Sequence, residues 1–245
     1  MIIWIASYPK SGNTYLRSFL ASYYFSDDGK FSFDQLLNIH QFPNMKFSKL
    51  RSSNKEEASK NWVFNQNSFF KNSNLNLVKT HNCLYPFKNN QFTTENETLG
   101  AIYIVRDPRN IITSLTHHYD LTYEEAYSHM IDENSSLLET SFELDHSNFT
   151  YLNSWSNHYK SWKNCKDFKV LFIRYEDIEY EKYKTFKKVL LFINSVSKKD
   201  NKIDEKKLIN SINSTNFNNL KNKEENEGFE ESVISRETGQ KKRFF

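Results

Sequence analysis

Residues 2–14, which read IIWIASYPKSGNT, decide the fold. Ile2–Ser7 is a short apolar run of the kind that forms a buried strand. A tight turn with Pro9 and Gly12 follows, and Thr14–Tyr24 then carries an apolar stripe at helical spacing. Such a turn leaves unpaired backbone N–H groups at a helix N-terminus, where the helix dipole also favours an anion. The stretch therefore predicts a strand–turn–helix unit that binds phosphate or sulfate.

The side chains of this turn favour the same ligand. Lys10 adds a full positive charge, Gly12 allows close backbone approach, and Ser11, Asn13 and Thr14 add donors. The lysine precedes the glycine, so the turn is not the Walker sequence Gly-x-x-x-x-Gly-Lys-Ser/Thr. The alternative is an ordinary turn between strand and helix, capped by a Ser or Asn.

Three more apolar runs predict strands at Leu75–Thr80, Ala101–Arg106 and Lys169–Tyr175. Their apolar residues on both faces indicate a parallel sheet covered on both sides. Helical patterns lie between or after these strands, at Asn110–His118, Asn153–Trp162 and Glu181–Ile193. Strand and helix in alternation predict an α/β doubly wound sheet, which we expect to form one domain over residues 1–245.

A second basic turn, Arg106-Asp107-Pro108-Arg109-Asn110, joins the third predicted strand to a helix. Arg106 lies at the carboxyl end of its strand, where open α/β sheets bind ligands, and its guanidinium can hold a phosphate bidentately. Ser114 lies two helical turns further on and could face the same anion. The alternative is that Arg106 pairs with Asp107 or another carboxylate.

Composition excludes several other classes of protein. The 245 residues have a net charge of +3, which does not indicate nucleic-acid binding, and only 5 glycines and 4 prolines, which excludes collagen-like and linker sequences. Cys83 and Cys165 share no metal-ligand spacing, and Met1–Ala6 is too short for a membrane span. We therefore expect a cytoplasmic protein without a membrane span. Ser195–Glu227, rich in Asn, Lys and Glu, predicts a solvated helix pair.

Five segments, in order along the chain, resemble motifs of the PAPS-dependent sulfotransferases. Tyr8–Tyr15, YPKSGNTY, resembles the family's phosphosulfate loop YPKSGTTW; the others are Val78–His81 (the KTH strand end), Ile104–His118 (the 3′-phosphate motif), Arg174–Asp177 (the YED strand end) and Ser214–Phe229 (the TSF segment). The resemblance implies a nucleotide-kinase-like, three-layer α/β fold and 3′-phosphoadenosine 5′-phosphosulfate (PAPS) as co-substrate.

The resemblance also implies roles for individual residues. Lys10, Ser11, Gly12, Asn13 and Thr14 would hold the 5′-phosphosulfate; Arg106 and Ser114 would hold the 3′-phosphate; Tyr15, Tyr175, Thr215 and Phe217 would contact the purine. His81 would be the general base, with Lys10 and Lys79 stabilising charge and no metal required. The alternative for a single histidine at a strand end is a satisfied surface or core residue.

The chain departs from the family at two places. After the loop glycine it has Asn13-Thr14-Tyr15 instead of Thr-Thr-Trp. The family's C-terminal motif RKGxxGxW has no good counterpart: Arg236 and Gly239 match it partially, and Arg243 lies closer to its expected place. We expect the domain to end inside this motif.

Two alternatives to a sulfotransferase therefore stay open. One is a non-catalytic remnant that binds PAPS or its product 3′-phosphoadenosine 5′-phosphate (PAP), and the other is a nucleotide or small-molecule kinase on a related fold. The acceptor would be a small molecule, lipid or carbohydrate, in a cleft shaped by 31–47 and 119–138. The sequence does not assign the oligomeric state.

Overall fold

The computed structural model describes residues 1–71, 76–138, 145–198, 202–229, 231–235 and 238–245. Its elements are β1 Ile2–Ser7, α1 Asn13–Phe25, η1 Phe33–Asn38, β2 His40–Gln41, η2 Met45–Phe47, α2 Lys55–Lys60, α3 Trp62–Phe70, β3 Asn76–Thr80, β4 Thr98–Val105, α4 Pro108–Tyr119, α5 Tyr123–Ile131, β5 Ser136–Leu137, β6 Thr150–Tyr151, α6 Trp155–Lys163, β7 Val170–Arg174, α7 Tyr175–Tyr180, α8 Lys182–Val196, α9 Glu205–Ser214 and α10 Phe217–Glu227.

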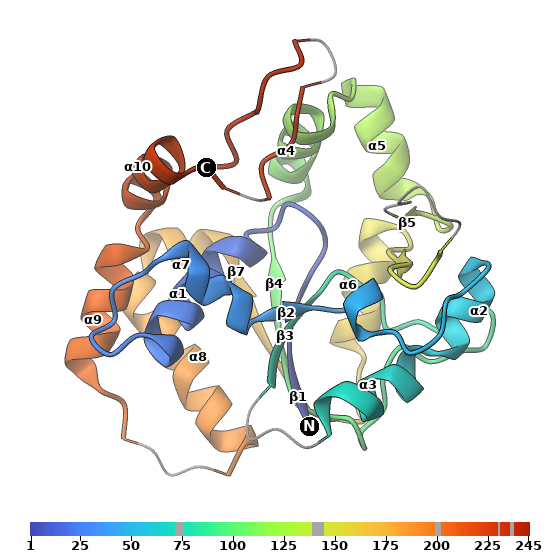
Figure 1. Cartoon of the computed structure of the whole chain (residues 1–245), viewed down its shortest axis with the longest axis horizontal. Coiled ribbons are helices and arrows are strands. Elements are labelled where there is room, and N and C mark those ends of the chain that lie inside the picture. Colours follow the sequence, from blue (N-terminus) through green and yellow to red (C-terminus); the bar gives the residue numbers. More distant parts are fainter. Residues whose placement is uncertain (72–75, 139–144, 199–201, 230, 236–237) are drawn as a thin grey trace.

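The central sheet has five parallel strands in the order β2-β3-β1-β4-β7 (Figure 1). The four predicted strands are confirmed as β1, β3, β4 and β7, although Leu75 lies outside the described residues. The short edge strand β2 and the antiparallel pair β5–β6 were not predicted. Each has only two residues, too few for a periodic pattern to be visible.

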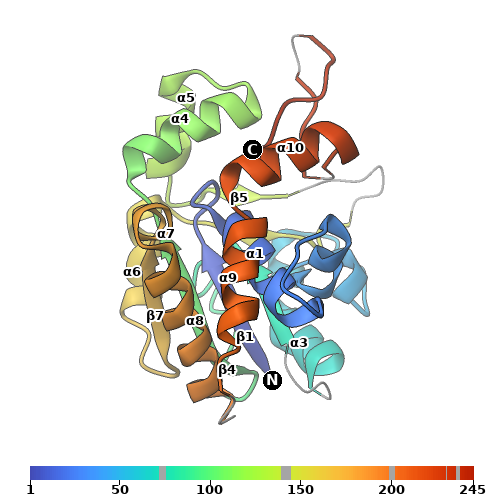
Figure 2. The same ribbon diagram turned by 90° about the vertical axis from the view of Figure 1, so that its left-hand side faces the viewer.

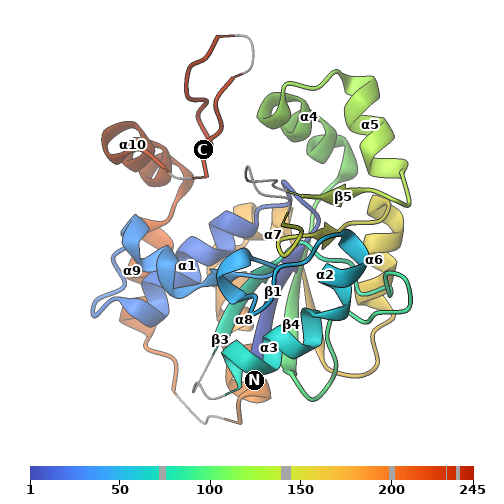
Figure 3. The same cartoon turned by 45° about the vertical axis from the view of Figure 1, so that its right-hand side comes forward.

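The alternating side chains of β1 face two separate hydrophobic clusters. Ile3 and Ile5 pack against buried residues of α1, α8 and α9, and Figure 2 shows α8 and α9 side by side on this face. Ile2 and Trp4 pack in the other cluster with buried tryptophans of α3 and α6, the helices on the opposite side in Figure 3. Both faces are thus covered, and the predicted α/β class with helices flanking a parallel sheet is confirmed.

The predicted helices are confirmed as α1, α4, α6 and α8. Helix α6 begins two residues later than predicted because Ser154 caps it, its side chain accepting a hydrogen bond from the Asn157 backbone. The predicted solvated pair corresponds to α9 and α10, but Leu208 and Leu220 are fully buried in the first cluster, so the pair also contributes to the core. None of the helices in the described segments is long and apolar enough to cross a membrane.

Helices α1, α4 and α7 each begin just after the carboxyl end of a strand, of β1, β4 and β7 respectively. Helix α10 and the C-terminal segment lie above the same end of the sheet, and the N-terminus lies at the opposite end (Figure 1). The loops between strand and helix therefore meet at one edge, as in other open α/β sheets.

Candidate functional site

A cavity of about 540 Å³ opens at the carboxyl ends of the strands. Of the residues that the sequence singles out, it is lined by Lys10, Gly12, Asn13, Thr14, Tyr15, Lys79, His81, Arg106, Ser114, Tyr175 and Phe217. Ser11, Thr215 and Arg243 are outside this lining. The fold therefore brings the two predicted basic turns and the β3 end into one space.

The turn after β1 needs glycine at one position. Gly12 has a φ of 93°, in the left-handed region, and a Cβ atom built there would lie 2.4 Å from the Tyr175 ring. Lys10 also has a positive φ, of 65°. This tight path brings the turn's backbone against the ring of Tyr175 and leads directly into the N-terminus of α1.

Arg106 connects the two basic turns. Its Nη1 donates a hydrogen bond to the Lys10 carbonyl at 2.9 Å, and its guanidinium carbon lies 4.3 Å from the centre of the Tyr175 ring. Asp107 pairs with Arg109 instead, whose Nε donates to Oδ1 at 3.0 Å. The alternative in which Arg106 pairs with Asp107 is therefore wrong, and Asp107 caps α4.

His81 lies at the end of β3, half-buried, on the cavity wall. Its Nδ1 is 2.7 Å from the Ser7 carbonyl oxygen, which can only accept, so Nδ1 carries a proton and Nε2 is the acceptor of the neutral ring. Burial, and then the charge of Lys79, lower the pKa of His81 to about 3 despite the bond to Ser7. At neutral pH the imidazole is therefore uncharged, and its Nε2 lone pair is an acceptor.

A buried histidine that the sequence analysis missed holds the backbone of His81. His158 of α6 lies with Nε2 at 3.0 Å from the His81 carbonyl and Nδ1 at 2.8 Å from the Tyr103 hydroxyl. The carbonyl can only accept, so Nε2 is the protonated nitrogen and Tyr103 donates to Nδ1. Only the helical pattern at Asn153–Trp162 was visible in the sequence, because the His81 carbonyl that His158 contacts lies at a distant strand end.

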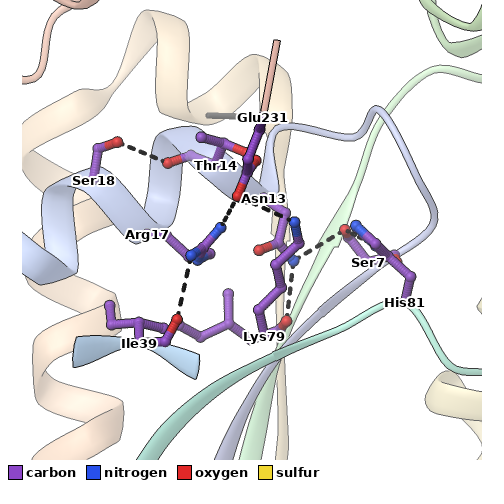
Figure 4. Close-up of polar contacts among 10 residues, drawn as sticks. Ser7, Asn13, Thr14, Arg17, Ser18, Ile39, Lys79, His81 and Glu231 are labelled. Carbon is purple, nitrogen blue, oxygen red and sulfur yellow. Dashed lines mark hydrogen bonds and ion pairs between the residues drawn. The ribbon is translucent and has the colours of Figure 1, made fainter. Parts of the chain in front are cut away.

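Lys10 enters the cavity from the turn after β1, and Lys79 enters it from β3. Burial, followed by the charges of Lys79 and Arg106, lowers the pKa of Lys10 to about 8, although Glu231 opposes the shift. Lys79 Nζ lies 3.4 Å from the Glu231 carboxylate. Figure 4 shows this carboxylate between Lys79, Thr14 and Arg17. Neither Arg17 nor Glu231 was predicted from the sequence, although an arginine inside the apolar pattern of a buried helix is a signal of a buried anionic partner.

Ser11 lies in the turn after β1 and Asn13 at the start of α1, and both are buried. Asn13 Nδ2 donates to the Ile5 carbonyl at 3.0 Å and to Ser7 Oγ at 3.1 Å, so it braces the turn from inside. Ser11 is buried, and its hydroxyl has no hydrogen-bond partner in the described part of the chain.

The side chains of Thr215 and Arg243 contact helices α9 and α10 and lie outside the cavity lining. The hydroxyl of Thr215 donates to the Ser211 carbonyl in α9 at 2.7 Å. Arg243 pairs with Glu225 of α10 at 3.1 Å and is not among the residues that line the cavity. Its predicted place in the site rested on distance along the chain alone. Phe244 and Phe245 line the cavity in its place. Arg236 lies outside the described residues.

A family model for the sulfotransferase domain matches residues 2–245. The chain belongs to the sulfotransferase domain family. Among solved structures, this sulfotransferase domain is similar to the crystal structure of mouse sulfotransferase SULT7A1 complexed with PAP, with 19% identity and a TM-score of 0.52. The match covers 90% of this chain and 65% of the mouse chain, so the present chain spans just under two thirds of that protein. At this identity the likeness supports the fold.

Proposed function

We propose that this sulfotransferase domain transfers a sulfuryl group from PAPS to a hydroxyl or amine acceptor. The observation that carries the proposal is the position of His81, which presents a neutral acceptor nitrogen in the cavity that Lys10, Lys79 and Arg106 also line. A base beside a cluster of cations suits the transfer of an anionic group to an acceptor that must lose a proton.

The residues around the turn fit such a co-substrate. Gly12 carries no side chain toward Tyr175, and the Lys10 charge and the N-terminus of α1 lie at the same end of the cavity. Arg106 and Ser114 line the wall formed by the second turn and α4, and would hold the 3′-phosphate. Tyr15, Tyr175 and Phe217 would contact the purine, and its phosphosulfate would meet Lys10, Thr14 and Lys79.

Each residue would then have a separate task. His81 Nε2 takes the proton of the acceptor as the acceptor's oxygen or nitrogen bonds to sulfur. The bond from sulfur to the phosphate oxygen breaks, and PAP leaves with that oxygen. Lys10 stabilises the negative charge that develops on the leaving oxygen, and Lys79 stabilises the sulfonate oxygens. The acceptor is a small molecule, lipid or carbohydrate.

The test is transfer of labelled sulfate from PAPS across a panel of phenol, carbohydrate, lipid and amine acceptors. We expect His81→Ala to reduce kcat by about a hundredfold or more, because it removes the base, while PAP binds as in the wild type. His129→Ala is the matched control, since His129 is exposed on α5. Unchanged turnover in His81→Ala would remove His81 from its role.

Two other outcomes would replace the proposal. PAP binding by calorimetry without transfer to any acceptor would identify a non-catalytic nucleotide-binding protein. Magnesium-dependent consumption of ATP, with no PAP binding, would identify a kinase on a related fold.

A further inference from the structure

Glu231 of the C-terminal segment places a carboxylate inside the cavity (Figure 4). Thr14 Oγ1 donates to Oε2 at 2.8 Å, and Arg17 Nη1 donates to Oε1 at 2.6 Å. Lys79 Nζ is the third donor, 3.4 Å from Oε1. Among the described residues that line the cavity, Glu231 is the only acidic one.

Arg17 is held next to Glu231 by its place on α1 and by its burial. It lies one helical turn after Thr14 on α1 and is only 5% exposed. Its Nη2 donates to the Ile39 carbonyl at 3.2 Å, which holds the guanidinium beside the Glu231 carboxylate (Figure 4). Arg17 is not among the residues that line the cavity, and Glu231 connects it to that space. A buried guanidinium needs an anionic partner, since an uncompensated buried charge is strongly destabilising. Glu231 supplies that partner here.

The carboxylate is held as an anion. Burial alone would raise the pKa of Glu231, but Lys79, Arg17 and the hydroxyl of Thr14 outweigh burial and hold the pKa well below its ordinary value. A second anion that came within reach of the same donors would repel this carboxylate strongly, because the site is buried. The three donors therefore serve one anionic group at a time.

We propose that Thr14, Arg17 and Lys79 form the binding site of the transferred sulfonate, and that the Glu231 carboxylate occupies it until PAPS displaces it. The inference rests on the proposed function, which already assigns Thr14 and Lys79 to the phosphosulfate. Arg17 becomes a further catalytic residue, contacting the sulfonate oxygens. Carboxylate and sulfonate oxygens accept the same charge-assisted hydrogen bonds, so one can take the other's place.

The experiment compares the affinities of PAPS and PAP, by calorimetry, for the full chain and three variants. PAP lacks the sulfonate, so the ratio of the two affinities isolates the sulfonate site from the rest of the nucleotide. The variants are Glu231→Gln, Arg17→Met and the matched control Glu225→Gln. Glu225 is an acid of the neighbouring helix α10 that pairs with Arg243 outside the cavity.

We expect Glu231→Gln to tighten PAPS about tenfold while PAP changes less than about twofold, because the competing charge is gone. Arg17→Met weakens PAPS about tenfold with PAP nearly unchanged, and Glu225→Gln changes neither ligand. If the ratio of PAPS affinity to PAP affinity in Glu231→Gln is the same as in the wild type or lower, the inference is overturned. This outcome decides even if Arg17→Met fails to fold. Absence of binding of both nucleotides to wild type and to Glu231→Gln overturns the proposed function as well.

Discussion

At the scale of single residues, the charge on Lys10 depends on its neighbours. Burial, and then the charges of Lys79 and Arg106 in the same cavity, bring the pKa of Lys10 down to about 8. The charged form is therefore dominant at neutral pH but is lost within a unit or two above it. His81, as the proposed base, would have the opposite requirement, since only the neutral imidazole can accept a proton.

We predict that binding and turnover decline at alkaline pH, and that kcat has no acid limb near the ordinary pKa of a histidine. PAP affinity and kcat/KM fall as pH rises through about 8, because Lys10 loses its proton. By contrast, kcat at saturating PAPS stays flat on the acid side far below 6.5, because the pKa of His81 is lowered to about 3 and the ring stays neutral. Lys10→Arg, whose charge persists, should move the alkaline limb upward. An acid limb of kcat near 6.5 contradicts this description of His81.

Glycine at position 12 is required for two reasons that can be separated. Gly12→Ala should lower the free energy of unfolding by more than about 2 kcal/mol, because it adds both a left-handed alanine and a clash with Tyr175. Gly239→Ala is the matched control: its φ is also positive, at 68°, but a Cβ there meets nothing within 4 Å. It should cost about 1 kcal/mol. Equal losses in chemical denaturation would show that the clash with Tyr175 is absent.

At the scale of elements, helix α6 holds the end of β3. The Trp162 indole donates to the Asn82 carbonyl at 3.0 Å, and Ser161 Oγ accepts from the Leu84 backbone at 3.0 Å. His158 donates to the carbonyl of His81 itself. Three bonds from one helix thus fix the segment that carries the proposed base.

His158 is therefore predicted to be a positioning residue. His158→Leu removes the donor to the His81 carbonyl and should lower kcat about tenfold while PAP affinity changes less than about twofold. His158→Gln keeps an N–H at the Nε2 position and should retain most of the turnover. Steady-state kinetics with calorimetry checks both. Equal loss in the two variants, or a parallel loss of PAP affinity, would indicate a structural role only.

The structural units that could be predicted from the sequence are those whose residues are neighbours along the chain. The strand–turn–helix unit at 2–24 is local, because its strand, glycine and helix start lie within a few residues of one another. Arg17, Glu231 and His158 were missed because their decisive partners are distant in sequence: Glu231 is 214 residues from Arg17, and His158 is 77 residues from His81. Arg243 was assigned from chain distance and lies against α10 instead. Contacts across elements need the sheet order, which the sequence does not reveal.

At the scale of the whole molecule, that sheet order assembles the cavity. β1 lies between β3 and β4, so Ala6 pairs in register with Thr80, and Ser7 with Ile104. The turn after β1, the proposed base and the second basic turn consequently emerge side by side. Helix α10 and the C-terminal segment complete the cavity with Phe217, Glu231 and Phe244. A nucleotide bound there would contact elements from both ends of the chain.

The most direct test of this account is the affinity of PAP, measured by calorimetry for the wild type, Arg106→Met and Arg109→Met. The two arginines flank the same turn, but Arg106 lines the cavity whereas the Arg109 side chain is 87% exposed and pairs with Asp107. We predict that the wild type binds PAP, that Arg106→Met weakens binding about tenfold or more, and that Arg109→Met leaves it within about twofold. No binding by the wild type, or equal losses in the two variants, would contradict the assignment of this cavity to the nucleotide.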